Sequence, residues 1–222
     1  MFSTPIRAIA FDLDGTLVDS LTDIAAAANA ARAELGLAPL ADSRVRGFIG
    51  DGSAMLMART AQDDPHAQVD DSPLQIAARA HFNQHYARVV SEHTRPYTGA
   101  VEGLQALAAL GLPLACVTNK PIAFTTPLLA ALDLAQYFQL VLGGDSLAAK
   151  KPDPLPLAHV AQALAVAPAQ LLMVGDSKND VLAARAHGSP VLAVSYGYTA
   201  SASALGADAV IDRIDQIVAL LG

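Results

Sequence analysis

Short apolar runs alternate with longer amphipathic stretches over much of the chain. The apolar runs predict buried strands at residues 6–11, 112–118, 140–144, 171–176 and 190–195, with a last strand near 208–211. The stretches between the later runs carry apolar residues at helical spacing, as in AVEGLQALAAL and LPLAHVAQALAV. Continuously apolar strands that alternate with helices are typical of a parallel sheet with helices on both faces. The pattern therefore predicts an α/β fold with a doubly wound, mostly parallel sheet.

The segment 16–92 breaks this alternation, because it contains helical patterns and no convincing strand. Helices are predicted at SLTDIAAAANAARAELG, SAMLMARTAQ and SPLQIAARAHFNQHYARVV. We expect Ser20 to cap the first of them, with Asp23 in its first turn. An all-helical insertion after the first strand suggests a small second domain. We accordingly predict a core domain at residues 1–15 and 93–222 and a helical cap domain at 16–92.

Composition narrows the choice of partners. The 222 residues carry a formal net charge of −7 and give a pI near 5.2, which argues against nucleic acid or an anionic membrane as a partner. Cys116 is the only cysteine, which excludes an internal disulfide and a cysteine-based zinc cluster. The N-terminal residues do not resemble a signal peptide, and no apolar segment is long enough to span a bilayer. We expect a cytoplasmic monomer or homodimer that acts on a small molecule.

Acidic residues follow two of the predicted strands. Asp12 and Asp14 end the first strand, and Asp176 and Asp180 follow the strand at 171–176. Side chains two residues apart in a strand point the same way, and doubly wound sheets bind ligands at the carboxyl ends of their strands. Carboxylates that converge there repel one another unless a cation lies between them. Oxygen ligands of this kind suit Mg²⁺, so the sequence predicts a magnesium site.

Neutral and positive groups follow the other strand ends. Thr118 and Asn119 end the strand at 112–118, and a helix beginning near Pro121 adds backbone N–H groups that favour an anion. Lys151 follows the strand at 140–144. A metal ion, a hydroxyl, an amide and an ammonium around one point suit phosphoryl transfer, where catalysis depends on positioning and on neutralising charge.

These stretches also carry a family resemblance. FDLDGTLVDS, VTNK, KKPDP and GDSKND, in this order, resemble the four motifs of the haloacid dehalogenase (HAD) superfamily of phosphotransferases. Within it the chain most resembles the phosphoglycolate phosphatases, through GLPLACVTNKPIAFTTPLLAAL, VGDSKNDVLAARAHG and VSYGY as well. The resemblance implies a HAD-like Rossmannoid core with a cap, the cofactor Mg²⁺ and a small phosphorylated metabolite as substrate. It implies hydrolysis of 2-phosphoglycolate to glycolate and phosphate as the reaction.

The resemblance also assigns roles to the first motif. Asp12 would be the nucleophile that becomes an aspartyl-phosphate. Asp14 would be the general acid and then the general base, while its backbone carbonyl binds Mg²⁺. A carboxylate needs no deprotonation to attack, and covalent capture divides one difficult displacement into two easier ones. We expect other negative charges to crowd Asp14, which would help it to hold the proton that an acid must give.

The other motifs supply supporting roles by the same resemblance. Thr118 would hold a phosphoryl oxygen, with Asn119 beside it, and Lys151 would steady the nucleophile and the transferring group. Asp176 would bind the metal, and Asp180 would support it.

Several alternatives remain at this stage. Asp12 and Asp14 can be ordinary strand-end residues that cap a turn, although four ordered motifs argue against it. Arg46, beside a glycine-rich loop, either binds a substrate carboxylate or is a surface arginine. The leaving group can also be pyrophosphate or another sugar phosphate, and a mutase of the β-phosphoglucomutase kind shares the same motifs. A phospho-accepting receiver domain has similar strand-end residues, but the helical insertion argues against it.

Overall fold

A computed structural model describes residues 2 and 4–221, and it divides into two compact units. We call Met1–Asp19 with Pro96–Gly222 the core unit, and Ser20–Arg95 the helical unit. The boundaries therefore lie at 19–20 and 95–96, a few residues beyond those predicted from the sequence. At these boundaries, β2 (Val18–Asp19) and β3 (Arg95–Pro96) form a small two-stranded sheet. Each strand has only two residues, so the hydrophobic pattern of the sequence does not reveal it.

The core unit contains one parallel sheet of six strands in the order β5-β4-β1-β6-β7-β8. The strands are β1 (Ala8–Phe11), β4 (Leu114–Val117), β5 (Leu140–Leu142), β6 (Leu171–Gly175), β7 (Val191–Val194) and β8 (Ala209–Ile211). All five neighbouring pairs are parallel, and Phe11 of β1 is in register with Cys116 on one side and Val174 on the other. All six predicted strands and the doubly wound, parallel fold class are confirmed.

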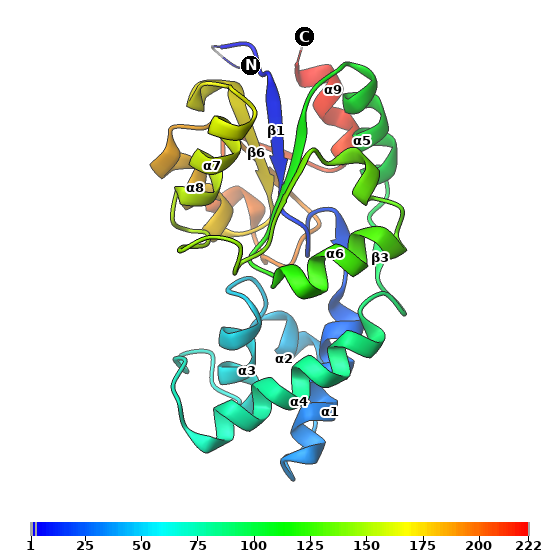
Figure 1. The fold of residues 1–222 in the computed structure, drawn as a ribbon, viewed down its shortest axis with the longest axis vertical. Coiled ribbons are helices and arrows are strands. Elements are labelled where there is room, and N and C mark those ends of the chain that lie inside the picture. The colour runs from blue at the N-terminus through cyan, green and yellow to red at the C-terminus, as the bar shows by residue number, and fades with distance from the viewer. Residues whose placement is uncertain (1, 3, 222) are drawn as a thin grey trace. The chain divides into compact units, whose positions relative to one another are not determined.

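Helices cover both faces of this sheet, as Figure 1 shows. α7 (Leu155–Ala163) and α8 (Lys178–His187) lie on one face, and α5 (Ala100–Ala109) and α9 (Ile217–Leu220) lie on the other. α6 (Ile122–Ala131) follows β4, and short 3-10 helices occur at Ala135–Tyr137, Pro168–Gln170, Ala202–Leu205 and Ile214–Gln216. The strand residues Ala8, Ala115 and Met173 pack with Leu157 and Val181 of the helices, and all five are buried.

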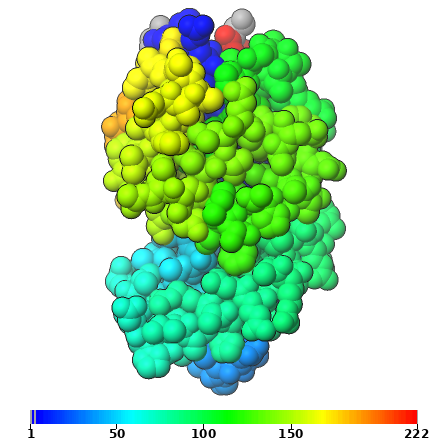
Figure 2. Space-filling model, viewed as in Figure 1, coloured from blue at the N-terminus to red at the C-terminus, as the bar shows by residue number. Residues whose placement is uncertain are grey.

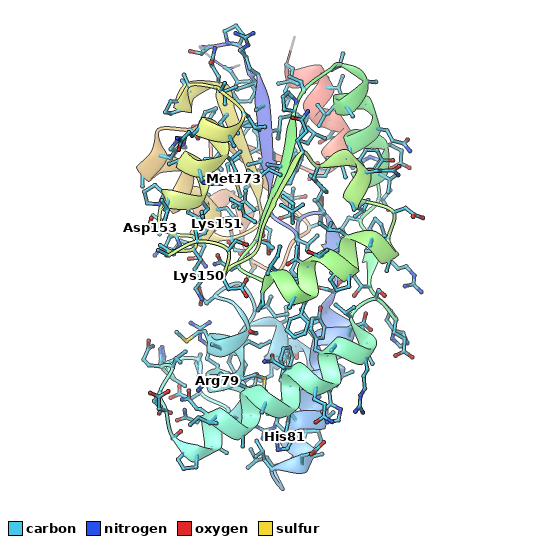
Figure 3. The ribbon with its side chains drawn as sticks, viewed as in Figure 1. Arg79, His81, Lys150, Lys151, Asp153 and Met173 are labelled. Carbon is cyan, nitrogen blue, oxygen red and sulfur yellow. The ribbon has the colours of Figure 1, made fainter. Side chains whose placement is uncertain are left out.

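Parallel pairing brings the carboxyl ends of β1, β4, β5 and β6 to one edge of the sheet. Figure 3 shows Lys150 and Lys151 on the segment beyond the carboxyl end of β5, whereas Met173 lies within the sheet. Figure 2 shows the described ends of the chain at the opposite end of the core unit. The described residues nearest the two termini are therefore remote from the edge that gathers the predicted site residues.

The helical unit consists of α1 (Leu21–Glu34), α2 (Asp42–Arg46), α3 (Ser53–Gln62) and α4 (Pro73–Val89). Its core includes the stacked rings of Phe82 and Tyr86, whose centroids are 5.2 Å apart. His81 on α4, labelled in Figure 3, has its Nδ1 atom 3.0 Å from a carboxylate oxygen of Glu34 on α1. The three long helices were predicted from the sequence, whereas the five-residue α2 was not.

The start of α1 differs from the prediction in its chemistry. Ser20 occupies the N-cap position, but its side chain makes no capping hydrogen bond. The carboxylate of Asp23 accepts hydrogen bonds from the backbone N–H groups of His93 and Thr94 and from the Thr94 hydroxyl. Asp23 therefore anchors the segment that leaves α4, and the expected capping by Ser20 is corrected.

Within the part of the chain that the structure describes, no helix combines the length and the apolar character needed to cross a bilayer.

Candidate active site

Three carboxylates meet at the carboxyl edge of the sheet. Oxygen atoms of Asp12, Asp176 and Asp180 all lie within 4.8 Å of one another, and all three residues are buried. Lys151 joins them, with its Nζ atom 3.0 Å from Asp12 Oδ1 and 2.6 Å from Asp180 Oδ1. The structure thus brings together three of the four carboxylates expected at this edge, with Lys151 among them, whereas the carboxylate of Asp14 is not part of the cluster.

The charge of this cluster is unbalanced. Three carboxylates and one ammonium leave an excess of two negative charges when all four groups are ionised. Burial raises the pKa of Asp12 to about 6 and that of Asp176 to about 8. Burial opposes the charged form of Lys151, but Asp12 and Asp180 outweigh it and raise the pKa of this ammonium. Protons or a cation must supply the missing positive charge, and a divalent metal ion matches the deficit.

Asp180 acts on its neighbours through both carboxylate oxygens. Oδ1 accepts the hydrogen bond from Lys151, and Oδ2 accepts hydrogen bonds from the backbone N–H and the hydroxyl of Ser177. These bonds to Ser177, the N-cap of α8, fix the carboxylate at the start of the helix. Asp180 therefore holds Lys151 in place, which is consistent with the supporting position expected for it.

Asp12 keeps an oxygen available for chemistry. Its backbone N–H donates to the carbonyl of Val174 at 2.9 Å, which fixes the residue between β1 and β6. Its Oδ1 atom is buried and lies 3.0 Å from the Lys151 ammonium, and no other described residue donates a hydrogen bond to it. The carboxylate therefore has lone pairs left for a metal ion or an electrophile.

Asp14 has a different partner from the one expected. The ammonium of Lys120 donates to Oδ1 and Oδ2 of Asp14, both at 2.8 Å. The side chains are 5% and 12% exposed respectively. The expectation that other negative charges crowd Asp14 is therefore corrected, because its carboxylate is paired with a cation. Lys120 ends the VTNK stretch, but sequence spacing alone does not reveal a pairing across 106 positions.

Thr118 and Asn119 lie in the loop that follows β4, and both are buried. The hydroxyl of Thr118 accepts a hydrogen bond from the backbone N–H of Lys120 at 3.2 Å. The Asn119 side chain donates through Nδ2 to the carbonyl of Lys151 at 2.8 Å. This bond ties the loop after β4 to the loop that carries Lys151, so Asn119 has a structural contact in addition to its expected place in the site.

The start of α6 is less available to an external anion than the sequence suggests. The helix begins at Ile122 with Pro121 as its N-cap, as predicted. However, the backbone N–H of Ile122 donates to the carboxylate of Asp145 at 2.8 Å. The protein therefore supplies a negative group at this helix end itself.

Sequence analysis missed the loop after β7, which contacts Asp176. The backbone N–H of Tyr198 donates to Asp176 Oδ2 at 2.6 Å. A methyl group on Gly197 would overlap Cβ of Asp176 and lie 2.6 Å from its Oδ2, and one on Gly15 would lie 2.5 Å from the same oxygen. The VSYGY stretch contains this loop, yet only the fold reveals that two glycines give the carboxylate its space.

Arg46 lies at the end of α2 in the helical unit and is exposed. Its expected contact with a substrate carboxylate therefore remains a prediction.

Known proteins have sequences related to this one. The model of the haloacid dehalogenase-like hydrolases matches residues 6–188. A protein of Chromobacterium violaceum named phosphoglycolate phosphatase is 48% identical over 97% of this chain and 96% of its own length. One of Escherichia coli with the same name is 44% identical over 87% of this chain and 82% of its own.

A solved structure is similar over the whole fold. The crystal structure of a predicted phosphoglycolate phosphatase from Haemophilus somnus covers 99% of this chain and 100% of its own, with a TM-score of 0.92 and 32% identity. The chain belongs to the haloacid dehalogenase-like hydrolases. The resemblance inferred from the four motifs is thus confirmed, and the chain is an enzyme of the phosphoric monoester hydrolase kind.

The contacts of Gly197 generate a first prediction. Gly197→Ala should displace the Asp176 carboxylate, weaken Mg²⁺ binding and lower kcat/KM by at least about 10-fold, as for other groups that orient metal ligands. Isothermal titration with Mg²⁺ and steady-state phosphate release measure the two effects. Gly47→Ala is the control, because the φ of −67° at Gly47 suits any residue and an added methyl group meets only the Arg44 carbonyl oxygen, at 3.5 Å. Unchanged Mg²⁺ affinity in a folded Gly197→Ala protein would contradict the prediction.

Proposed function

We propose that this chain is a Mg²⁺-dependent phosphatase that hydrolyses 2-phosphoglycolate to glycolate and phosphate through an aspartyl-phosphate on Asp12. The observation that carries the proposal is the charge of the buried cluster, where Asp12, Asp176 and Asp180 share the ammonium of Lys151. A divalent ion balances that charge, and a transferring phosphoryl group needs the same cations.

The residues of the cluster fit Mg²⁺. The carboxylates of Asp12 and Asp176 are hard oxygen ligands, and the backbone carbonyl of Asp14 is a third. Asp180 has both oxygens committed to Lys151 and Ser177, so we assign it to support and not to the metal. Bound there, Mg²⁺ would neutralise charge on the cluster and on the substrate's phosphoryl oxygens.

In the first step, the Asp12 carboxylate attacks phosphorus, and the bond from phosphorus to the leaving oxygen breaks. Lys151 holds the nucleophile and offsets the charge on the phosphoryl group, while Thr118 and Asn119 are placed to hold its oxygens. Asp14 gives its proton to the leaving oxygen, which departs as an alcohol.

In the second step, a water molecule attacks the phosphorus of the aspartyl-phosphate. Asp14, now a carboxylate, accepts a proton from this water, and Asp12 departs as a free carboxylate with inorganic phosphate as the product. Asp14 thus returns to its protonated form, and the proton balance over the two steps closes.

The substrate is assigned from the relatives and from the helical insertion. The relatives described above carry the name phosphoglycolate phosphatase and extend over nearly the whole chain. We assign the segment predicted at 16–92 as a cap that excludes bulk water, with Arg46 as the group that binds the substrate carboxylate. Membership of a hydrolase family argues against a receiver domain, which would retain its phosphoryl group.

The assignment of Asp12 has a direct test. Asp12→Asn should abolish turnover of 2-phosphoglycolate, because the amide is a poor nucleophile, and should leave the melting temperature within a few degrees. Acid quench with ³²P-labelled substrate, followed by peptide mass analysis, should locate the label on Asp12 in the wild-type protein. Asp71→Asn, at a fully exposed side chain, is the matched control. Labelling of another residue would remove Asp12 as nucleophile.

Metal removal tests the cofactor separately. EDTA should reduce turnover to background, and Mg²⁺ should restore it. Asp176→Asn should weaken Mg²⁺ binding, measured by titration calorimetry, by roughly 10- to 100-fold. Full turnover in EDTA would refute the magnesium requirement.

Arg46 can be tested with two substrates that differ by one carboxylate. Arg46→Ala should lower kcat/KM for 2-phosphoglycolate roughly 10- to 100-fold, the value of a charge-assisted pair, and leave ethyl phosphate nearly unchanged. Arg44→Ala is the control from the same helix, because Arg44 pairs with Asp63 at 2.7 Å. Equal losses on both substrates would show that Arg46 does not bind the carboxylate. Sugar-phosphate isomerisation without phosphate release would indicate a mutase instead.

A further inference from the structure

Lys120 is a buried lysine that the roles above leave unused. It lies two residues after Thr118 in the loop that follows β4. Its ammonium is 2.8 Å from each oxygen of Asp14, in the turn that follows β1. Burying the ammonium of a lysine is unfavourable unless an anion is paired with it, and Asp14 is that partner for Lys120.

The pairing fixes the orientation of the Asp14 carboxylate. Equal donation to Oδ1 and Oδ2 places the ammonium on the axis of the carboxylate and opposes its rotation about the bond to Cβ. The loop that carries Lys120 is itself held, since Lys120 N–H donates to the Thr118 hydroxyl and Asn119 donates to the Lys151 carbonyl. Lys120 thus connects Asp14 to the loops that follow β4 and β5.

The use of lysine in this chain supports a specific role. The chain contains four lysines, namely Lys120, Lys150, Lys151 and Lys178, and all follow β4, β5 or β6. The ten other basic residues are arginines. An ammonium is a compact point charge, whereas a guanidinium needs a planar fork of space. Of the four, Lys120 and Lys151 are buried and paired with carboxylates, where a compact ammonium fits.

We propose that Lys120 is a positioning residue that holds Asp14 against the leaving oxygen of the substrate. The proposal rests on the proposed function, in which Asp14 gives a proton to that oxygen and later takes one from water. While Asp14 carries its proton on one oxygen, Lys120 donates to the other, and Lys120 exchanges none of its own protons with the substrate. Its contribution is therefore greatest for substrates whose leaving oxygen must be protonated.

Leaving-group dependence provides the test. Ethyl phosphate has a poor leaving group and needs the acid, whereas 4-nitrophenyl phosphate releases a stable anion and hardly needs it. In single-turnover measurements, Lys120→Met should slow phosphoenzyme formation from ethyl phosphate by about 100-fold, the lower range for general acid catalysis. The burst of 4-nitrophenolate should change by no more than a few-fold, and KM should change little for either substrate.

Controls separate this role from a structural one. Lys178→Met removes an exposed ammonium and should leave both substrates unaffected. Lys120→Gln keeps one donor and should recover part of the rate with ethyl phosphate, and it replaces Lys120→Met if that variant does not fold. Equal losses with both leaving groups, or no loss with either, would overturn the proposal. Absence of any phosphoenzyme in the wild-type protein would instead overturn the proposed function.

Discussion

Three carboxylates buried around one ammonium impose the constraint on which the rest of the site depends. Asp12 and Asp176 follow two adjacent parallel strands, β1 and β6, and Asp180 lies in the first turn of α8, which follows β6, so the fold itself brings the three together. Lys151 offsets only part of their charge, and burial together with the neighbouring carboxylates raises the pKa of Asp12 and of Asp176. A site with excess negative charge favours a divalent cation, and a transferring phosphoryl group would need that cation as well, so this charge connects the fold with the proposed chemistry.

A second ammonium separates the two aspartates of the first motif. Asp12 shares Lys151 with Asp180, whereas Asp14 has both oxygens on Lys120. Two identical side chains two residues apart thus have different electrostatic surroundings. Different surroundings are how one site assigns nucleophile and acid–base roles to groups of the same type. The division also explains how the first motif tolerates two acidic residues beside a buried strand.

The sequence predicted those features that depend on local pattern or on strand order. Continuous apolar runs revealed β1, β4 and β6, and parallel pairing then implied that Asp12 and Asp176 meet. Pairings between loops were not predictable, because neither Lys120 with Asp14 nor Tyr198 with Asp176 has any fixed sequence spacing. The capping expected of Ser20 was wrong for a similar reason. The backbone N–H groups of His93 and Thr94, which are distant in sequence, donate to the carboxylate of Asp23 near this helix start. Similarly, the backbone N–H of Ile122, expected to favour an external anion, donates to the carboxylate of Asp145.

The most direct test of the account is a crystal structure of the protein grown with Mg²⁺ and beryllium fluoride, which mimics a phosphoryl group. The account predicts a beryllofluoride group on the carboxylate of Asp12. It also predicts a magnesium ion bound by Asp12, Asp176 and the backbone carbonyl of Asp14. An adduct on another residue, or a cluster that binds no magnesium under these conditions, would contradict the claim that the buried charge is built for a metal ion and a phosphoryl group.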